Sequence, residues 1–217
     1  MAVTGDYSPP TSPIDVIHAD NEILVVAKPH GLLSVPGKGV HLADSLLTRL
    51  KVAFPATLLV HRLDRDTSGV MAFALTPHAQ RHLGLQFEKR QVRKAYVARV
   101  HGQVPGNAGT IDLPLAVDWP SRPRQKVDLR HGRPALTSWE LLQAHADESR
   151  LMLFPRTGRS HQLRVHCLAI GHPILGDPLY AEGEARQHHR LMLHSMSVRF
   201  RHPAHGRAVS FSAEPEF

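Results

Sequence analysis

Short apolar runs, separated by polar turns and prolines, dominate the hydrophobic pattern of this chain. Continuous or alternating apolar positions predict strands at residues 23–27, 70–75, 96–100, 135–142, 151–154, 196–200 and 208–211. The stretches at 135–142 and 151–154 are expected to pair with each other, and the last two to form a closing hairpin.

Helices are expected at fewer places. The pattern predicts them at residues 44–52 and 77–90, and from 158 or 160 to 170. Thr76 and Pro77 are favoured at the first positions of a helix, and Gly171 is a typical helix stop. Because strands outnumber helices and many are hairpin neighbours, the predicted fold class is α+β, with a mixed, mostly antiparallel central sheet.

The chain is predicted to have a short arm and one domain. Residues 1–13 are polar and rich in proline, which favours a flexible N-terminal arm. Residues 14–217 then form a single domain, long enough to bury a sizeable core.

Composition narrows the classes of partner and compartment. The 26 Lys and Arg residues exceed the 19 Asp and Glu residues, for a formal charge of +7, which favours a polyanion such as nucleic acid but also suits a basic protein with no such role. No apolar run or leader segment predicts a membrane span or secretion, and the single cysteine, Cys167, excludes an internal disulfide, so the expected location is the cytoplasm. The 17 histidines show no metal-ligand spacing, and no metal is predicted.

The chemically distinctive segment is His-Arg-Leu-Asp-Arg-Asp-Thr-Ser-Gly at residues 61–69. It places Asp64 between Arg62 and Arg65, on a loop between two apolar segments. Nearby guanidinium groups keep a carboxylate ionised, and an ionised aspartate in a cleft can act as a nucleophile. Residues 66–69 are ordinary turn formers, and His61 is expected to be structural, with a backbone hydrogen bond.

The segment at 61–69 resembles the active-site motif of the RluA family of RNA pseudouridine synthases. Further resemblances follow in the family's order: Lys-Pro-x-Gly at 28–31, Arg-Lys-Ala-Tyr-Val-Ala at 93–98, Thr-Gly-Arg-Ser-His-Gln-Leu-Arg-Val-His at 157–166, and Gly-His-Pro-Ile-Leu-Gly-Asp-Pro-Leu-Tyr at 171–180. The resemblance spans about residues 14–217 and implies the pseudouridine synthase fold, with a cleft across the sheet and no S4 RNA-binding domain.

What the resemblance implies is isomerisation of uridine to pseudouridine in structured RNA, with no cofactor. Asp64 matches the catalytic aspartate, Tyr96 the tyrosine that stacks on the target base, and Arg164 the arginine that pairs with the catalytic carboxylate. The expected substrates are a 23S rRNA hairpin loop and tRNA anticodon stem-loops, and the expected state is a monomer. The target uridine would be flipped out of its stack.

Other residues have two interpretations each. Arg62 is expected to fill the space of the flipped base, or else to contact phosphate or form an ion pair. Leu163 is either a wall of the uracil pocket or core, and Tyr96 without the resemblance would be read as core. Five basic residues are either phosphate contacts or solvated surface: Lys28, Arg122, Arg124, Lys126 and Arg159.

Two other functions remain open from the sequence. A hydrolase could break the same N-glycosidic bond with Asp64 and water, releasing the free base. A non-catalytic RNA-binding or ribosome-assembly protein could use the same fold, although the combination of Asp64, Tyr96 and Arg164 argues against it.

Overall fold

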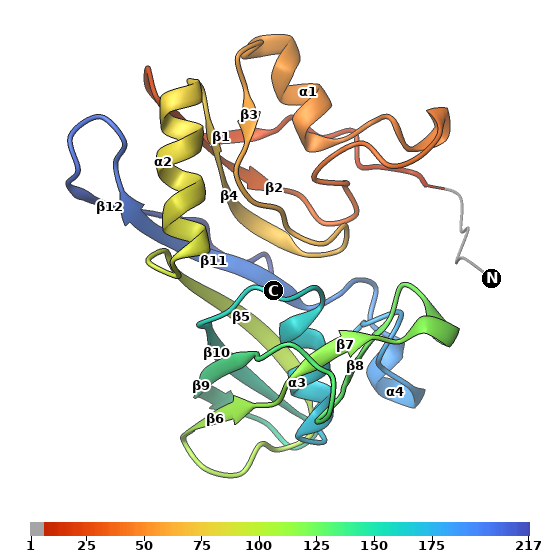
Figure 1. Ribbon diagram of the computed structural model, residues 1–217. Helices are drawn as coiled ribbons and strands as arrows, with labels where there is room; N and C mark the ends of the chain where they lie inside the picture. The colour runs from red at the N-terminus through yellow and green to blue at the C-terminus, as the bar shows by residue number, and fades with distance from the viewer. Residues whose placement is uncertain (1–6) are drawn as a thin grey trace. The chain divides into compact units, whose positions relative to one another are not determined.

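A computed structural model describes residues 7–217, and the chain divides into two compact units (Figure 1). One unit comprises residues 7–94 and His194–Glu216, and the other Ala95–Leu193 with Phe217. We call them the Asp64 unit and the Arg164 unit, after one residue of each.

The Asp64 unit contains a mixed sheet. Its strands are β1 (Asp15–Ala19), β2 (Ile23–Lys28), β3 (Leu58–Leu59), β4 (Ser68–Ala74), β11 (Leu193–Arg201) and β12 (Ala208–Ser212). The hydrogen-bonded order runs β1-β2-β4-β11, while β3 also pairs with β4 and β12 with β11. The pairing of β4 with β11 is parallel, and the other pairings are antiparallel.

Two α-helices and a short 3-10 helix, η1 (Val40–Leu42), complete this unit. α1 (Leu46–Ala53) begins after Ser45, and α2 (Pro77–Glu88) begins after Thr76, whose hydroxyl accepts a hydrogen bond from the Ala79 amide at 3.0 Å. The apolar face of α2 is buried in one core with the sheet, which removes enough apolar surface from water to hold the helix. That core comprises Ile23, Val25, Val70, Ala72, Ala74, Ala79, Leu83, Val92, Val198 and Phe200.

The Arg164 unit is built on antiparallel strands. β5 (Arg93–His101), which begins in the other unit, pairs with β10 (Glu148–Pro155), then come β9 (Leu136–Ala144) and β6 (Ala108–Asp112). A separate two-stranded hairpin consists of β7 (Leu115–Val117) and β8 (Gln125–Val127), and its connection contains the 3-10 helix η2 (Trp119–Ser121).

The helix α3 (Gln162–Ala169) is central to this unit, which also holds the short α4 (Gly183–Arg186). Six consecutive residues of α3, from Gln162 to Cys167, are buried, so the helix is surrounded by protein and lacks a solvent face there. Its start follows His161, which has a positive φ of 53°, and its end precedes Gly171, with φ of 86°. Val165 packs in a core with Leu115, Ala135 and Tyr180.

Most elements expected from the hydrophobic pattern are confirmed, including the pairing of β9 with β10, the closing hairpin of β11 and β12, and the mixed, mostly antiparallel α+β architecture. The strands β1, β3, β6, β7 and β8 and the helix α4 were not predicted. Each has at most five residues, which is too short to give a clear hydrophobic period in the sequence. Among the described residues, no helix is both long and apolar enough to cross a membrane.

The predicted N-terminal arm is described in part. Residues 1–6 lie outside the described residues. Tyr7 is anchored, because its hydroxyl accepts a hydrogen bond from the Leu33 amide at 3.0 Å and donates to the Asp44 carbonyl at 2.9 Å. The described part of the arm, residues 7–13, is therefore attached to the Asp64 unit through its first residue, Tyr7.

Candidate active site

The loop that carries Asp64 connects β3 to β4 in the Asp64 unit. Asp64 is half-buried, and its carbonyl accepts a hydrogen bond from the Thr67 amide at 3.2 Å, which closes a turn. Leu63 is buried beside it, with 7% of its surface exposed. The turn therefore has one residue anchored in the core and the next, Asp64, partly open to solvent.

A buried lysine holds this loop. Lys28, at the end of β2, is 1% exposed, and its ammonium donates to the carbonyls of Pro29 at 2.9 Å, Leu32 at 2.7 Å and Arg65 at 2.8 Å. Burial of an ammonium is tolerated when its N–H groups are hydrogen-bonded. Two interpretations of Lys28 came from the sequence, a contact with RNA phosphate or a solvated surface position, and a side chain this buried suits neither. It instead ties the Lys-Pro turn to the Asp64 loop.

Ser34 and Gly69 fix the loop at two further points. The Ser34 hydroxyl donates to the Leu63 carbonyl at 2.6 Å and accepts from the Leu63 amide at 3.2 Å. Gly69 has φ of 112°, and a Cβ atom there would collide with the backbone of Ser195 on β11. Glycine is required at this position both by conformation and by the close approach of β11.

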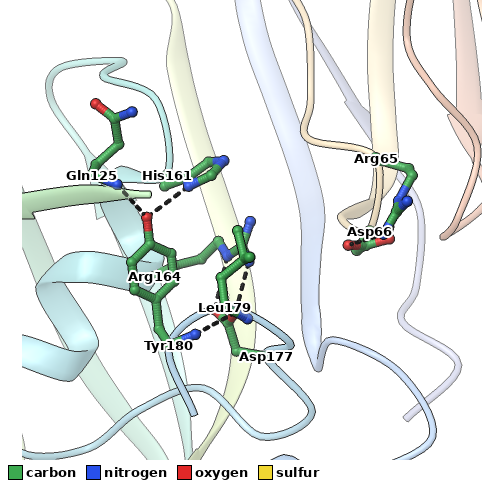
Figure 2. Close-up of polar contacts among 8 residues, drawn as sticks. All are labelled: Arg65, Asp66, Gln125, His161, Arg164, Asp177, Leu179 and Tyr180. Atoms are coloured by element: carbon green, nitrogen blue, oxygen red, sulfur yellow. Dashed lines mark hydrogen bonds and ion pairs between the residues drawn. The ribbon is translucent and has the colours of Figure 1, made fainter. Parts of the chain in front are cut away.

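The two arginines beside Asp64 differ. Arg65 forms a bidentate pair with Asp66, with Nε to Oδ1 at 2.8 Å and Nη2 to Oδ2 at 3.2 Å (Figure 2). Arg62 is exposed, as expected for a residue that contacts RNA, although its predicted role in base flipping stays a prediction.

His61 has a structural environment. Its Nε2 accepts a hydrogen bond from the Ala72 amide at 3.0 Å, and its ring stacks on Phe87 with centroids 4.6 Å apart. Burial, with a smaller contribution from the positive charge of Lys94, lowers the pKa of His61 to about 3. The imidazole is therefore neutral at physiological pH, and the expected backbone hydrogen bond is confirmed.

In the Arg164 unit, Arg164 on α3 forms a buried bidentate ion pair with Asp177. Its Nε donates to Oδ2 at 2.8 Å and its Nη2 to Oδ1 at 2.6 Å, and the two side chains are 3% and 0% exposed (Figure 2). Such planar, charge-assisted pairs fix the orientation of the guanidinium. The predicted pairing of Arg164 with Asp64, a residue of the other unit, stays a prediction.

Tyr180 completes the surroundings of this pair, which we call the Arg164 centre: Arg164, Asp177 and Tyr180. Asp177 Oδ1 also accepts from the amides of Leu179 at 2.9 Å and Tyr180 at 3.1 Å, and the Arg164 guanidinium carbon lies 5.0 Å from the centroid of the Tyr180 ring. The Tyr180 hydroxyl accepts from the Gln125 amide at 2.7 Å and shares a 2.7 Å hydrogen bond with His161 Nδ1 (Figure 2).

Two side chains of α3 tie this helix to β9. The Gln162 amide group donates to the Leu136 carbonyl at 3.1 Å and to the Thr137 hydroxyl at 3.0 Å. His166 lies 2.9 Å from that hydroxyl through Nδ1, and its Nε2 donates to the Leu113 carbonyl at 3.0 Å. Burial lowers the pKa of His166, which favours the neutral ring that can accept from Thr137.

Sequence reasoning missed the role of Asp177. It lies in the quoted Gly-Asp-Pro-Leu-Tyr motif, and its signal is an acidic residue that follows the apolar Ile174-Leu175 pair after one glycine, Gly176. A buried carboxylate in such a context requires a cation, but the sequence does not show which one.

The remaining predicted residues lie in the Arg164 unit. Tyr96 on β5 is 9% exposed and stands opposite Leu153 of β10, and Leu163 on α3 is 7% exposed. Arg159 is half-buried, and its Nε donates to the Pro134 carbonyl at 3.1 Å. Roles of these residues toward a substrate stay predictions. Within residues 7–217, no group of three or more His, Cys, Asp or Glu side chains could hold a metal ion.

Comparison with known proteins gives consistent matches. A family model described as RNA pseudouridylate synthase matches residues 22–169. The chain is 49% identical over 215 residues to the dual-specificity RNA pseudouridine synthase RluA of Escherichia coli K12, covering 98% of both chains, and 49% identical over 204 residues to the protein of that name from Yersinia pestis, covering 93% and 99%.

Solved structures show the same relationship. Human RNA pseudouridylate synthase domain containing 1 superposes with a TM-score of 0.79 at 30% identity, covering 97% of this chain and 87% of the human one. Human RNA pseudouridylate synthase domain containing 4 gives a TM-score of 0.74 at 26% identity, covering 93% and 89%.

Proposed function

We propose a mechanism and substrates for this chain from one premise: it belongs to the RNA pseudouridylate synthase family, and is therefore an isomerase that converts uridine in RNA to pseudouridine. In this reaction the bond between uracil N1 and ribose C1′ breaks and a bond between C5 and C1′ forms. C5 loses a proton and N1 gains one, so the RNA keeps its composition.

The catalytic carboxylate in this proposal is Asp64. The observation that carries it is the contrast within the loop: the backbone around Asp64 is fixed by Lys28 and Ser34, while the Asp64 side chain stays partly exposed. An ionised, positioned carboxylate can stabilise the positive charge that develops at C1′, or add covalently to C1′ or to uracil C6.

Tyr96 and Arg164 act on the same reaction in this proposal. Tyr96 stacks on the uracil and assists removal of the C5 proton, and Arg164 orients the Asp64 carboxylate. Asp177 supports this assignment, because its bidentate pair fixes the Arg164 guanidinium before any substrate arrives.

RNA recognition in this proposal involves base flipping. The target uridine leaves its stack, at a cost of a few kcal/mol that is smallest in an open loop. Arg62 is exposed beside Asp64 and fills the vacated space. Leu163 contacts the uracil and Arg159 the RNA backbone.

The proposed substrates are a 23S rRNA hairpin loop and tRNA anticodon stem-loops. The relatives that are 49% identical carry the description dual-specificity, which supports two classes of RNA target. We propose that the protein acts on them as a monomer in the cytoplasm.

Tritium release tests the proposal. An anticodon stem-loop and an rRNA hairpin, each labelled with tritium at uridine C5, are incubated with the wild type, Asp64→Asn and Asp66→Asn. We expect release by the wild type and by Asp66→Asn, and none by Asp64→Asn, because C5 loses its proton when it bonds to C1′.

Other outcomes have distinct meanings. Free uracil in place of tritium release would indicate a hydrolase. RNA binding without either product, with both RNAs and with total cellular RNA, would indicate a binding protein. Release by Asp64→Asn equal to that of the wild type would overturn the assignment of the carboxylate.

A further inference from the structure

The β7–β8 hairpin of the Arg164 unit presents an aromatic ring to solvent. Trp119, in η2, is 67% exposed, and the Arg122 guanidinium carbon lies 3.5 Å from the centroid of its ring. Because Arg122 covers one face of the indole, the exposed area belongs mainly to the other face and the ring edges. Single exposed apolar residues are common on proteins, so exposure alone gives Trp119 no role.

The loop that carries this pair is held in one shape. Its backbone closes through hydrogen bonds from the Asp118 amide to the Arg124 carbonyl at 3.0 Å, from Ser121 to Asp118 at 3.1 Å, and from Arg124 to Ser121 at 3.0 Å. In Figure 1 this light-green connection extends beyond the ends of β7 and β8. Trp119 is therefore presented in a fixed position, and little ordering entropy is lost when a ligand stacks on it.

The same hairpin is rich in positive charge. Between Asp118 and Arg133 the chain carries five Arg and Lys residues and two Asp residues. One of these acids, Asp128, accepts hydrogen bonds from the amides of Arg130 at 3.1 Å and His131 at 2.9 Å, so its carboxylate is engaged in its own turn. The basic residues are Arg122, Arg124, Lys126, Arg130 and Arg133.

The loop end of the hairpin is joined to the Arg164 centre. The backbone N–H of Gln125 donates to the Tyr180 hydroxyl at 2.7 Å, and the Arg124 guanidinium carbon lies 5.3 Å from the Tyr180 ring centroid. The same Tyr180 ring lies under the Arg164 guanidinium. The hairpin is thus anchored on a residue that also surrounds the proposed catalytic arginine.

We propose that Trp119 and Arg122 form a stacking platform for an unpaired base of the substrate RNA, and that the surrounding cations contact its phosphates. Aromatic rings in a basic setting bind single-stranded nucleic acid in this way, since every base offers a flat face. The inference rests on the proposed recognition of open RNA loops, and it makes Trp119 a binding residue outside the bond-making step.

Fluorescence tests the contact directly. The chain has two tryptophans, so Trp139→Phe leaves Trp119 as the source of indole emission. With Asp64→Asn added to prevent turnover, the anticodon stem-loop should quench this emission, and a fully paired duplex of the same stem should quench it much less. Equal quenching by the two RNAs, or none, would overturn the stacking contact.

Kinetics tests its importance. Trp119→Ala should raise KM for the stem-loop about 5- to 150-fold, the range for loss of one base stack, with kcat changed much less. Trp119→Phe should recover most of the loss. Arg122→Lys keeps the charge but loses the planar stack on Trp119, so its KM should rise above that of the wild type. Leu142→Ala, at an exposed leucine of β9, is the matched control and should match the wild type.

Salt dependence separates stacking from charge. Lys126→Gln should reduce the slope of log affinity against log salt by about 0.7 to 0.9, whereas Trp119→Ala should lower affinity and leave the slope unchanged. A Trp119→Ala protein with wild-type KM and an unchanged melting temperature would overturn the proposal.

Failure of the proposed target is distinguishable from failure of this inference. If the wild type releases no tritium from the stem-loop, the quenching titration is repeated with total cellular RNA. Quenching there would support the platform with another RNA target, and its absence would overturn the platform as well.

Discussion

The Asp64 loop and the Arg164 centre hold their candidate residues in opposite ways. In the loop, buried polar side chains bind the backbone: Lys28 holds the carbonyl of Arg65, and Ser34 holds both polar groups of Leu63. In the Arg164 centre, the side chains hold each other, and Asp177 takes two of the guanidinium nitrogens of Arg164.

In the Asp64 loop, the proposed catalytic side chain and the side chains that hold the loop belong to different residues. In the Arg164 centre, the proposed catalytic side chain is itself part of the buried ion pair that stabilises the region. The Asp64 side chain is half-buried, and the backbone of its loop is held by Lys28 and Ser34. The charges of Arg164 and Asp177 are almost fully buried, so each is stable in the core only while the other is present. Substitutions in the two regions should therefore differ in kind.

The largest expected effect is the loss of activity in Asp64→Asn. Without the carboxylate the rate of pseudouridine formation should fall about 10⁴- to 10⁶-fold, as on loss of a catalytic nucleophile. Because the isosteric amide leaves the loop anchors intact, the free energy of unfolding should change by less than about 0.5 kcal/mol. Urea unfolding beside single-turnover kinetics measures both, and a large loss of stability would remove the contrast between the regions.

Arg164→Met should damage stability as well as rate. It leaves the Asp177 carboxylate buried without its pair, which costs about 3–5 kcal/mol in the free energy of unfolding. The Arg99–Glu148 pair offers a matched control, since it is also bidentate, at 3.0 and 2.6 Å, but its side chains are 26% and 23% exposed.

Arg99→Met should accordingly cost less than about 1 kcal/mol in the same urea titration. Equal losses in the two variants would show that burial does not set the cost. A stable Arg164→Met protein with full activity would exclude Arg164 from both proposed roles.

Lys28→Met should give an intermediate effect. Three carbonyls lose a charged donor, and part of that loss is offset because an ammonium no longer has to be buried, for a net cost of about 2–3 kcal/mol. Movement of the Arg65 carbonyl should also displace Asp64 and lower kcat by up to about 10²-fold. Lys51→Met, at an exposed position of α1, is the control, and a Lys28→Met loop with normal kcat would show that Ser34 and Gly69 suffice.

The sequence predicted much of the fold because most strands are apolar runs. β2 and β4 are buried along nearly their whole length, and the Thr76-Pro77 start of α2 is a local signal read without tertiary information. β1 escaped prediction because its residues are exposed or half-buried, and its position depends on pairing with β2.

The sequence located the segments that form the candidate site, but it did not predict which side chains contact each other there. Lys28 looks like a surface cation in the sequence, and its burial depends on the Arg65 carbonyl, 37 residues away. Asp177 follows Arg164 by 13 residues and lies in the connection between α3 and α4, so no helical spacing points from one to the other. Resemblance located the motifs, but the partners of their charged groups follow from the folded chain.

The smallest expected effect is a pH dependence of the free energy of unfolding, and it comes from His61 in the Asp64 loop. Its pKa in the folded protein is lowered from 6.5 to about 3, so the unfolded chain takes up the proton first as the pH falls. The contribution of the neutral His61 to the free energy of unfolding is complete above pH 6.5 and is lost as the pH falls toward 3. The loss should amount to about 1 kcal/mol between pH 6.5 and 5.5.

His61→Gln tests this assignment. It keeps an acceptor for the Ala72 amide but cannot be protonated there, so urea titrations at the two pH values should show a shallower dependence than the wild type. His131→Gln, at an 84% exposed side chain, should keep the wild-type slope, and an unchanged slope in His61→Gln would mean that His61 is not the group that titrates.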